Sequence, residues 1–271
     1  SQISVSQEGN NPKVHDSDGK MIQYESRGCT QESEEEDSAM GEEMGAQYFR
    51  KMKQLMRNLP FLMLCLALTA IYFIVTGIQY WVSDYMITEL KLPEKEVFIT
   101  FAIVSITGPV LGVVVGGNLT TCLGGYGSKN ALMLTLFTAV FCVGSAAPIP
   151  FVNEFPVFVC LLWFLLFLGG SMLPSMTGIM LSTVDKQFKT TANSIANLSY
   201  NLLGYLPAPS IYGLIYDSGT GGNARSAMAT LMFTPIISLI CLIAAAYLLV
   251  RSDVLQYKKQ AEEKKTKRKH K

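Results

Sequence analysis

Six long apolar stretches alternate with short polar segments from about residue 59 to residue 250. Each has close to the twenty or so residues that an α-helix needs to cross the hydrocarbon core of a bilayer. A soluble domain could not hide so much continuous apolar surface, so the pattern predicts an all-α membrane protein with a bundle of six transmembrane helices. The six predicted spans are residues 59–84, 97–117, 130–150, 155–181, 192–216 and 227–250.

Polar side chains within two of these spans recur every three or four residues. The first span carries Thr69, Tyr72, Thr76 and Gln79, with Tyr80 beside them, and such spacing places them on one helix face. The fifth span carries asparagines at positions 193, 197 and 201. Each stripe could serve interhelical hydrogen bonding or could line a wet cavity. Three asparagines on one face exceed what packing requires, which favours a cavity for the second stripe.

Small residues and prolines predict local features of two spans. Gly108, Gly112 and Gly116 form a repeated small-xxx-small pattern, which lets another helix approach closely. Pro207 and Pro209 lie in the fifth span, so we expect that helix to break or kink there.

Charge divides the chain into three expected regions. Residues 1–49 hold eleven acidic and three basic residues, few apolar ones and no hydrophobic period, which predicts a disordered acidic segment. The six-helix bundle is expected to occupy residues 50–250. A basic tail follows over residues 251–271.

The basic residues also predict the orientation of the bundle. Sixteen of them flank the spans on one side, against only Lys91, Lys95 and Arg225 on the other. The positive-inside bias then places both termini in the cytosol, without indicating which membrane is crossed.

The sequence lacks the residues of a metal or catalytic centre within the spans. Both histidines, His15 and His270, lie in the tails, and there is no CxxC motif. No Asp, Glu, Lys or Arg lies clearly at mid-membrane depth, where a coupling residue would be expected. We therefore expect neither a metal, a cofactor nor an enzyme activity.

Three motifs occur in an order typical of one transporter family. Residues 117–125 (GNLTTCLGG), taken as the loop after the second span, resemble a G-x-L-x-D-R-x-G signature, with Thr121 and Cys122 in place of Asp and Arg. Residues 189–194 (KTTANS) resemble a basic-x-x-Ala helix entry, and residues 203–217 (LGYLPAPSIYGLIYD) resemble a G-x(4)-P-x-I-x-G-x(3)-D ending. On these motifs, residues 59–250 resemble the C-terminal six-helix half of a major facilitator superfamily transporter, nearest to the spinster-like and related organic-solute branches.

The resemblance implies a secondary transporter that moves a small organic solute, amphipathic or lipid-like, by alternating access. Residues 1–49 would be the cytosolic loop between two six-helix halves, and an N-terminal half would lie outside this sequence. The expected partners are the solute, the lipid bilayer and that second half, with no nucleic acid. Substrate would lie between the halves near the midplane. The expected substrate-binding residues are Tyr72, Thr76, Gln79, Tyr80, Trp163, Asn193, Asn197 and Asn201.

A different class of function also fits the sequence. The chain could be a non-transporting membrane scaffold or receptor-like protein that acts through its charged tails, with the polar stripes as packing contacts. A channel or an intramembrane enzyme lacks support, because there is no arginine ladder, selectivity-loop signature, aspartate pair or His/Glu cluster.

Overall fold

The computed structural model describes residues 50, 52–53, 55–218 and 224–269, with side-chain environments up to residue 251. The predicted acidic segment, residues 1–49, lies outside the described residues. The chain divides into two units, Ser1–Arg50 and Lys51–Lys271, and all the helices described below belong to the second.

The described residues form helices and contain no strand, which confirms the predicted fold class. Within the described ranges, five helices are long and apolar enough to cross a membrane, judged by length and composition. These helices are α2 (Leu59–Thr88), α3 (Glu94–Cys122), α4 (Lys129–Ala146), α5 (Phe155–Ser182) and α8 (Ala224–Lys269). A sixth, interrupted run consists of α6 (Lys189–Tyr200), the π-helical turn η3 (Asn201–Tyr205) and α7 (Pro207–Asp217). Short 3-10 turns, η1 (Ile149–Phe151) and η2 (Lys186–Phe188), follow α4 and α5.

The interruption of the sixth run confirms the break predicted from its prolines. The turn η3 ends where the backbone N–H of Leu206 donates to the carbonyl of Asn201, five residues earlier, at 3.1 Å. Pro207 follows at once and can donate no such bond. A wide turn is a common way for a helix to accommodate a break in its regular hydrogen bonding.

The end of α3 differs from the prediction. Residues 117–125 were expected to form a loop, but the helix continues to Cys122, so that expectation was wrong. The Asn118 amide donates to the carbonyl of Val114 at 2.8 Å, and the Thr120 hydroxyl donates to that of Gly116 at 2.7 Å. Such bonds satisfy polar side chains on the helix itself, so their polarity does not end it. The chain leaves the helix only near Gly124, whose φ of 101° favours glycine.

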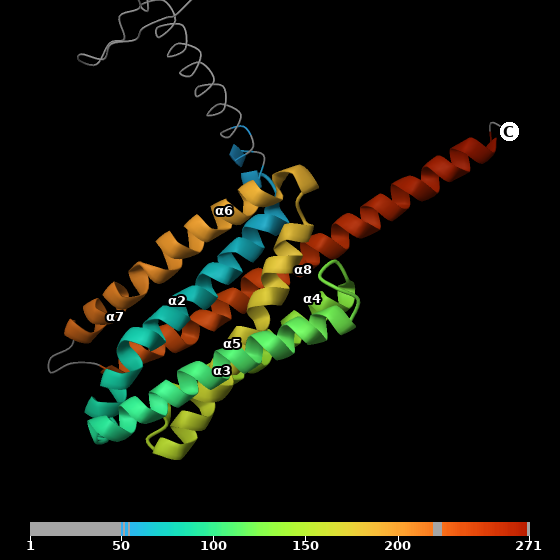
Figure 1. Cartoon of the computed structure of the whole chain (residues 1–271). Coiled ribbons are helices and arrows are strands. Elements are labelled where there is room, and N and C mark those ends of the chain that lie inside the picture. Colours follow the sequence, from blue (N-terminus) through green and yellow to red (C-terminus); the bar gives the residue numbers. More distant parts are fainter. Residues whose placement is uncertain (1–49, 51, 54, 219–223, 270–271) are drawn as a thin grey trace, which may run out of the picture. The chain divides into compact units, whose positions relative to one another are not determined.

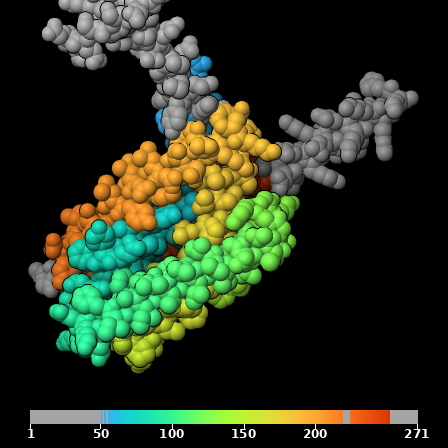
Figure 2. Space-filling model, viewed as in Figure 1, coloured from blue at the N-terminus to red at the C-terminus, as the bar shows by residue number. Residues whose placement is uncertain are grey.

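Two central helices organise the bundle (Figure 1). Helix α5 packs mainly on α3 and α4, whereas α2 packs mainly on α8 and the α6–α7 run. The flanking helices α4 and α8 also pack on each other. On the face shown in Figure 2, α2 and the later part of α5 lie between α3 and the α6–α7 run.

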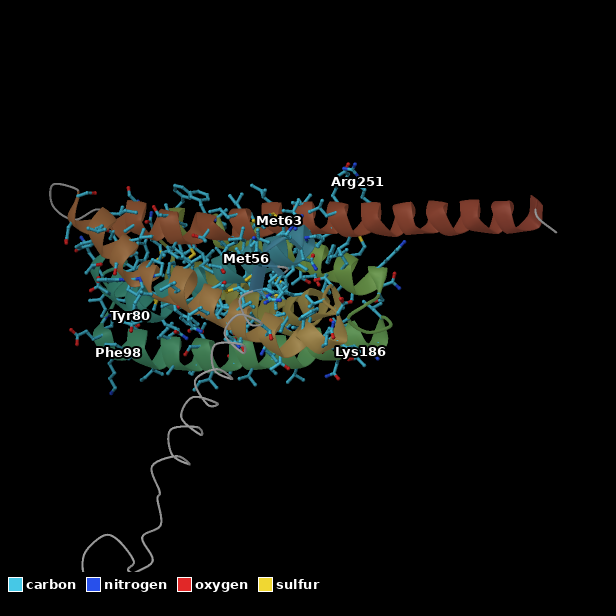
Figure 3. All side chains as sticks on the ribbon, turned by 90° about the horizontal axis from the view of Figure 1, so that it is seen from above. Met56, Met63, Tyr80, Phe98, Lys186 and Arg251 are labelled. Atoms are coloured by element: carbon cyan, nitrogen blue, oxygen red, sulfur yellow. The ribbon has the colours of Figure 1, made fainter. Side chains whose placement is uncertain are left out.

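The two ends of the bundle differ in charge. One end, here called the Glu89 end, holds the C-terminus of α2 and the start of α3 with Lys91 and Lys95, as well as Arg225. Tyr80 and Phe98 lie toward it, and Lys186 and Arg251 lie toward the other end, here called the Lys186 end (Figure 3). Lys91, Lys95 and Arg225 thus lie apart from Lys186 and Arg251, in agreement with the predicted grouping for these described residues, while the side of the membrane that each end faces stays a prediction.

Candidate functional site

Aromatic side chains join α2 to the α6–α7 run along most of its length. The Tyr72 ring stacks on Tyr200, with ring centroids 4.2 Å apart, and lies 5.1 Å from the ring of Tyr205. Nearer the Glu89 end, the Trp81 ring stacks on Tyr212 at 4.7 Å. We call these five residues the aromatic seam. Trp81 also donates through Nε1 to the Pro209 carbonyl at 3.2 Å, which ties α2 to α7 just past the break.

Small residues allow this close approach. A Cβ added at Gly204 would lie 2.8 Å from the Thr69 carbonyl oxygen and 3.3 Å from the Tyr72 Cβ, so no larger residue fits without a shift of α2. The other small residues of this buried stripe recur at four-residue spacing; they are Ala192, Ala196 and Ala208. The glycine therefore sets the distance at which the tyrosine rings can stack.

The predicted residues of α2 follow the aromatic seam. Tyr72 is half-buried within it. Thr76 is 3% exposed, and its hydroxyl donates to the Tyr72 carbonyl at 3.0 Å. Gln79 and Tyr80 lie nearer the Glu89 end and are exposed, Tyr80 to 67%. They present a polar surface on a helix whose other side forms the core.

The predicted asparagines lie on the neighbouring run. Asn193 and Asn201 are exposed and Asn197 is half-buried. The Asn201 amide donates to the Asn197 carbonyl at 2.7 Å, so one of its donors is satisfied within its own run. Because α6 packs directly on α2, the structure brings these asparagines to the helix beside that of Tyr72 and Thr76.

Trp163 lies in a different part of the bundle. It is half-buried on α5, donates through Nε1 to the Thr107 hydroxyl of α3 at 3.0 Å and stacks on Phe167 at 5.2 Å. It also lines a cavity of about 450 Å³ with Thr100 and Cys160. Its described contacts therefore tie Trp163 to α3 and do not join it to the other seven predicted residues.

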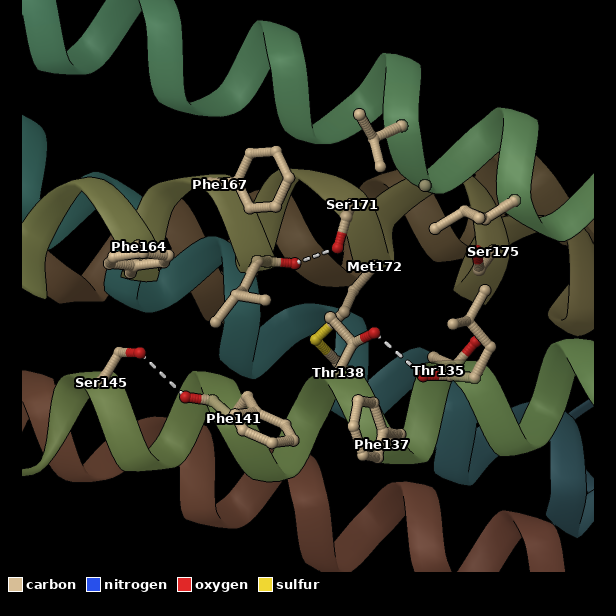
Figure 4. Close-up of a pocket in the computed structure, with 15 residues that line it drawn as sticks. Thr135, Phe137, Thr138, Phe141, Ser145, Phe164, Phe167, Ser171, Met172 and Ser175 are labelled. Carbon is tan, nitrogen blue, oxygen red and sulfur yellow. Dashed lines mark hydrogen bonds between the residues drawn. The ribbon is translucent and has the colours of Figure 1, made fainter.

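Two further cavities flank the central helices. One, of about 340 Å³, lies among α3, α4 and α5 and is walled by phenylalanines and hydroxyl side chains (Figure 4). Most of its hydroxyls bond back to their own helices, as Ser145 does to the Phe141 carbonyl at 2.9 Å, whereas that of Ser175 bonds to Thr120 of α3. The other, of about 630 Å³, lies among α2, the α6–α7 run and α8, and its lining includes Phe73 and Thr230. Neither contains a charged lining residue or any of the eight predicted residues.

The glycine pattern of α3 forms a helix–helix contact, as predicted. A Cβ at Gly112 would overlap the Phe167 carbonyl of α5, and one at Gly116 would overlap that of Ser171. Next to them the Thr120 and Ser175 hydroxyls are hydrogen-bonded at 2.5 Å, both buried. This contact is a packing feature.

The aromatic seam was only partly foreseen. Tyr212 is wholly buried, although it was not among the predicted site residues. The four-residue recurrence of small residues that leads to Gly204 was the available signal for the buried face. Among the described residues, no three His, Cys, Asp or Glu side chains are grouped so that they could hold a metal ion.

Comparison with known proteins identifies the family. The profile of the Major Facilitator Superfamily matches residues 21–209. Two similar solved structures are of a bacterial homolog of the human lysosomal transporter Spinster, inward-facing, one unoccupied and one occupied. The unoccupied one shares 14% identity at a TM-score of 0.55, covering 74% of this chain and 48% of that one. The occupied one shares 15% identity at a TM-score of 0.56, covering 71% and 49%.

The chain thus spans about half the length of those structures. No curated protein matches it. The profile match covers most of the sequence, and the chain belongs to the Major Facilitator Superfamily.

Proposed function

We propose that this chain is the C-terminal six-helix half of a secondary transporter for a small organic solute, amphipathic or lipid-like. It works by alternating access against a second six-helix half, and it is not an enzyme. The family and the fold shared with a bacterial homolog of a lysosomal transporter support this proposal. So does the chain's coverage of about half of those structures.

One observation carries the proposal furthest: polar side chains stay exposed along α2 and α6. Gln79 and Tyr80 of α2, Asn193 of α6 and Asn201 of η3 are all exposed, and apolar residues such as Leu198 are exposed beside them. An amide that faces lipid costs several kcal/mol, so such a surface needs water or a protein partner. A second half closing over a wet cavity supplies both.

The eight predicted residues have unequal places in this proposal. Tyr72, Thr76, Gln79, Tyr80 and the asparagines would orient the polar part of a solute from α2 and α6. Trp163 would contact an apolar part from α5, where it borders its own cavity. Neighbouring helices of a half commonly contribute to one midplane site in transporters.

A labelling experiment tests whether the asparagine stripe is wet. The background chain would carry serine in place of its six cysteines. We expect a water-soluble methanethiosulfonate reagent to label Asn197→Cys in membranes. The matched control is Leu198→Cys, since Leu198 is 65% exposed next to Asn197 but apolar, and there we expect no labelling. Equal labelling of both positions, or none at 197, would contradict a wet asparagine face.

The need for a second half has its own test. The chain purified as a monomer and placed in vesicles should insert but not carry solute, because a single half offers one wall of the site. Uptake by the monomer would contradict the two-half proposal. Vesicles that also hold the second half and still show no flux would favour the scaffold function instead.

We also propose that the Lys186 end faces the cytosol and that both termini lie on that side of the membrane. The uneven distribution of basic residues supports this orientation. The sequon at Asn118 would then lie on the cytosolic side and remain unmodified. A glycosidase-sensitive mass shift that disappears in Asn118→Gln would show the opposite orientation.

A further inference from the structure

A buried hydroxyl without a partner marks the aromatic seam near the Glu89 end. Tyr212 is 0% exposed, and its hydroxyl makes no hydrogen bond in the described part of the chain. Its ring is flanked by Trp81 at 4.7 Å and by Tyr216 at 6.4 Å, both nearly parallel to it. Leaving a buried polar group unpaired is unfavourable, so the site favours an additional hydrogen-bonding group.

A carboxylate lies on the face of α2 that packs against Tyr212 through Trp81. Asp84 is half-buried on α2, three residues after Trp81 and therefore on the same face of the helix.

The neighbouring cation does not neutralise Asp84. Arg225 pairs with Glu89 at 3.2 Å and donates to the Asn153 side-chain oxygen at 2.5 Å. Tyr85, the other hydroxyl nearby, donates to the Pro150 carbonyl at 3.3 Å. No hydrogen bond or ion pair involves the Asp84 carboxylate within the residues that the structure describes.

The charge of the Glu89 end favours a cation. The helix ends and the connecting segments at the Glu89 end carry six acidic and three basic residues, a net charge of −3. The acidic residues are Asp84, Glu89, Glu94, Glu96, Glu154 and Asp217. Such an excess raises the local concentration of cations.

We propose that Asp84 and Tyr212, with the Trp81 and Tyr216 rings, form a binding site for a protonated amine. The ammonium N–H groups donate to the Asp84 carboxylate and to the Tyr212 oxygen. The faces of the half-buried Trp81 and Tyr216 rings attract the positive charge, and the stacked rings exclude water. A hard metal ion fits less well, because it prefers six or more oxygen ligands and these side chains offer few.

The site lies nearer the Glu89 end than the eight residues assigned to solute binding, and it does not depend on transport. A binding measurement on this chain therefore tests it whether or not the transport proposal holds. Methylammonium is the smallest suitable probe, since it carries the charge and the N–H donors with little apolar surface. Dodecyl maltoside micelles provide a background without amine head groups.

The first measurement is equilibrium dialysis of radiolabelled methylammonium against the full chain at neutral pH and constant ionic strength. We expect saturable binding of about one per chain that sodium chloride does not displace. Asp84→Asn should weaken it on the order of tenfold or more, since it removes a charged acceptor. Asp217→Asn is the matched control, because it removes an exposed acid from the same end of the bundle and should change binding less than twofold.

Two further readouts separate binding from misfolding. The chain has two tryptophans, so Trp163→Phe leaves Trp81 as the sole reporter, and its emission should change saturably with methylammonium. Tyr212→Phe keeps the stacked ring, so without amine its melting temperature should equal or exceed that of the unaltered chain. Methylammonium should raise the melting temperature of the unaltered chain but not that of Tyr212→Phe.

Three outcomes would overturn the proposal. The first is no saturable retention of methylammonium by the unaltered chain in dialysis. The second is equal displacement by sodium, which would indicate a diffuse counter-ion effect. The third is retention unchanged in Asp84→Asn, which would place any amine elsewhere.

Discussion

The two central helices, α5 and α2, pack against their neighbours through different kinds of residue. Where α5 meets α3, glycines place the backbones against each other, as at Gly112 and Gly116. Where α2 meets the α6–α7 run, one glycine brings the helices close and stacked rings fill the remainder. Both pairs run parallel, so the difference lies in the side chains and not in the direction of the chain.

That difference bears on how each contact can move. A backbone-to-backbone contact has one geometry, because no side chain can rotate to relieve a clash. A contact between rings can slide or tilt with small changes in energy. We therefore expect α3 and α5 to move as one body, and we expect adjustment to occur along the aromatic seam.

The largest expected effect comes from filling the glycine contact. Gly112→Leu should cost about 3 kcal/mol or more and leave little folded protein, since the added atoms meet the Phe167 backbone. Gly117→Leu is the matched control on the same helix, because nothing lies within 4 Å of a Cβ there. Yield and thermal melting in detergent measure both, and equal stability would contradict the rigid contact.

A methyl group added to the aromatic seam should have a smaller effect. Gly204→Ala meets the Thr69 carbonyl and should destabilise the chain by about 1–3 kcal/mol. Gly213→Ala is its control, since the nearest atom of Trp81 lies at an ordinary 3.8 Å. That change should be neutral or stabilise the helix by up to about 1 kcal/mol. Similar losses in both variants, by denaturant titration, would argue against a specific close approach at Gly204.

The buried hydroxyl pair tests how much a hydrogen bond adds to the contact between α3 and α5. A double-mutant cycle of Thr120→Val and Ser175→Ala should give a coupling of about 0.6–2 kcal/mol, typical of hydrogen bonds between membrane helices. Thr121→Val provides the control, because that exposed hydroxyl bonds only to the Gly117 carbonyl of its own helix. A coupling near zero between Thr120 and Ser175 would leave the glycines alone responsible for the contact.

The smallest expected effect is that of one ring pair. A cycle of Tyr72→Leu and Tyr200→Leu should show a coupling of about 0.5–1.5 kcal/mol, as for other stacked aromatic pairs. Phe137 and Phe141 form a comparison pair, since their rings also touch but both side chains are exposed. If the exposed pair couples as strongly as the half-buried pair of Tyr72 and Tyr200, the aromatic seam has no special role in holding the run to α2.

Hydrophobic patterning predicted well where the helices lie along the sequence. It predicted only in part how they end and how they pack against one another. Apolar runs located all six spans because a bilayer imposes a minimum length on each. The helix ends were less predictable: Asn118 and Thr120 look like loop residues, yet they bond to their own helix and extend it. The glycine contact could be predicted because small residues on one face of a helix allow close approach by whichever helix packs there.

The candidate site was harder to predict for a physical reason. Periodicity places a residue on a face but does not say which helix covers that face. Trp163 was therefore grouped with residues that lie on other helices, whereas its hydrogen bond joins it to Thr107. The aromatic seam also depends on the wide turn η3, whose effect on the direction of later side chains no local spacing rule supplies.

The direction in which Tyr212 points depends on the number of residues in η3 and not only on their types. The buried positions from Ala192 to Tyr212 follow a four-residue period, and each such step overshoots an α-helical turn by about 40°. Five steps would carry the last position about 200° around the helix, away from α2. The turn η3 contains one residue more than an α-helical turn. This extra residue reverses about 100° of the rotation away from α2. Deleting a single residue there would leave every side chain of α7 chemically unchanged and still present Tyr212 to a different neighbour.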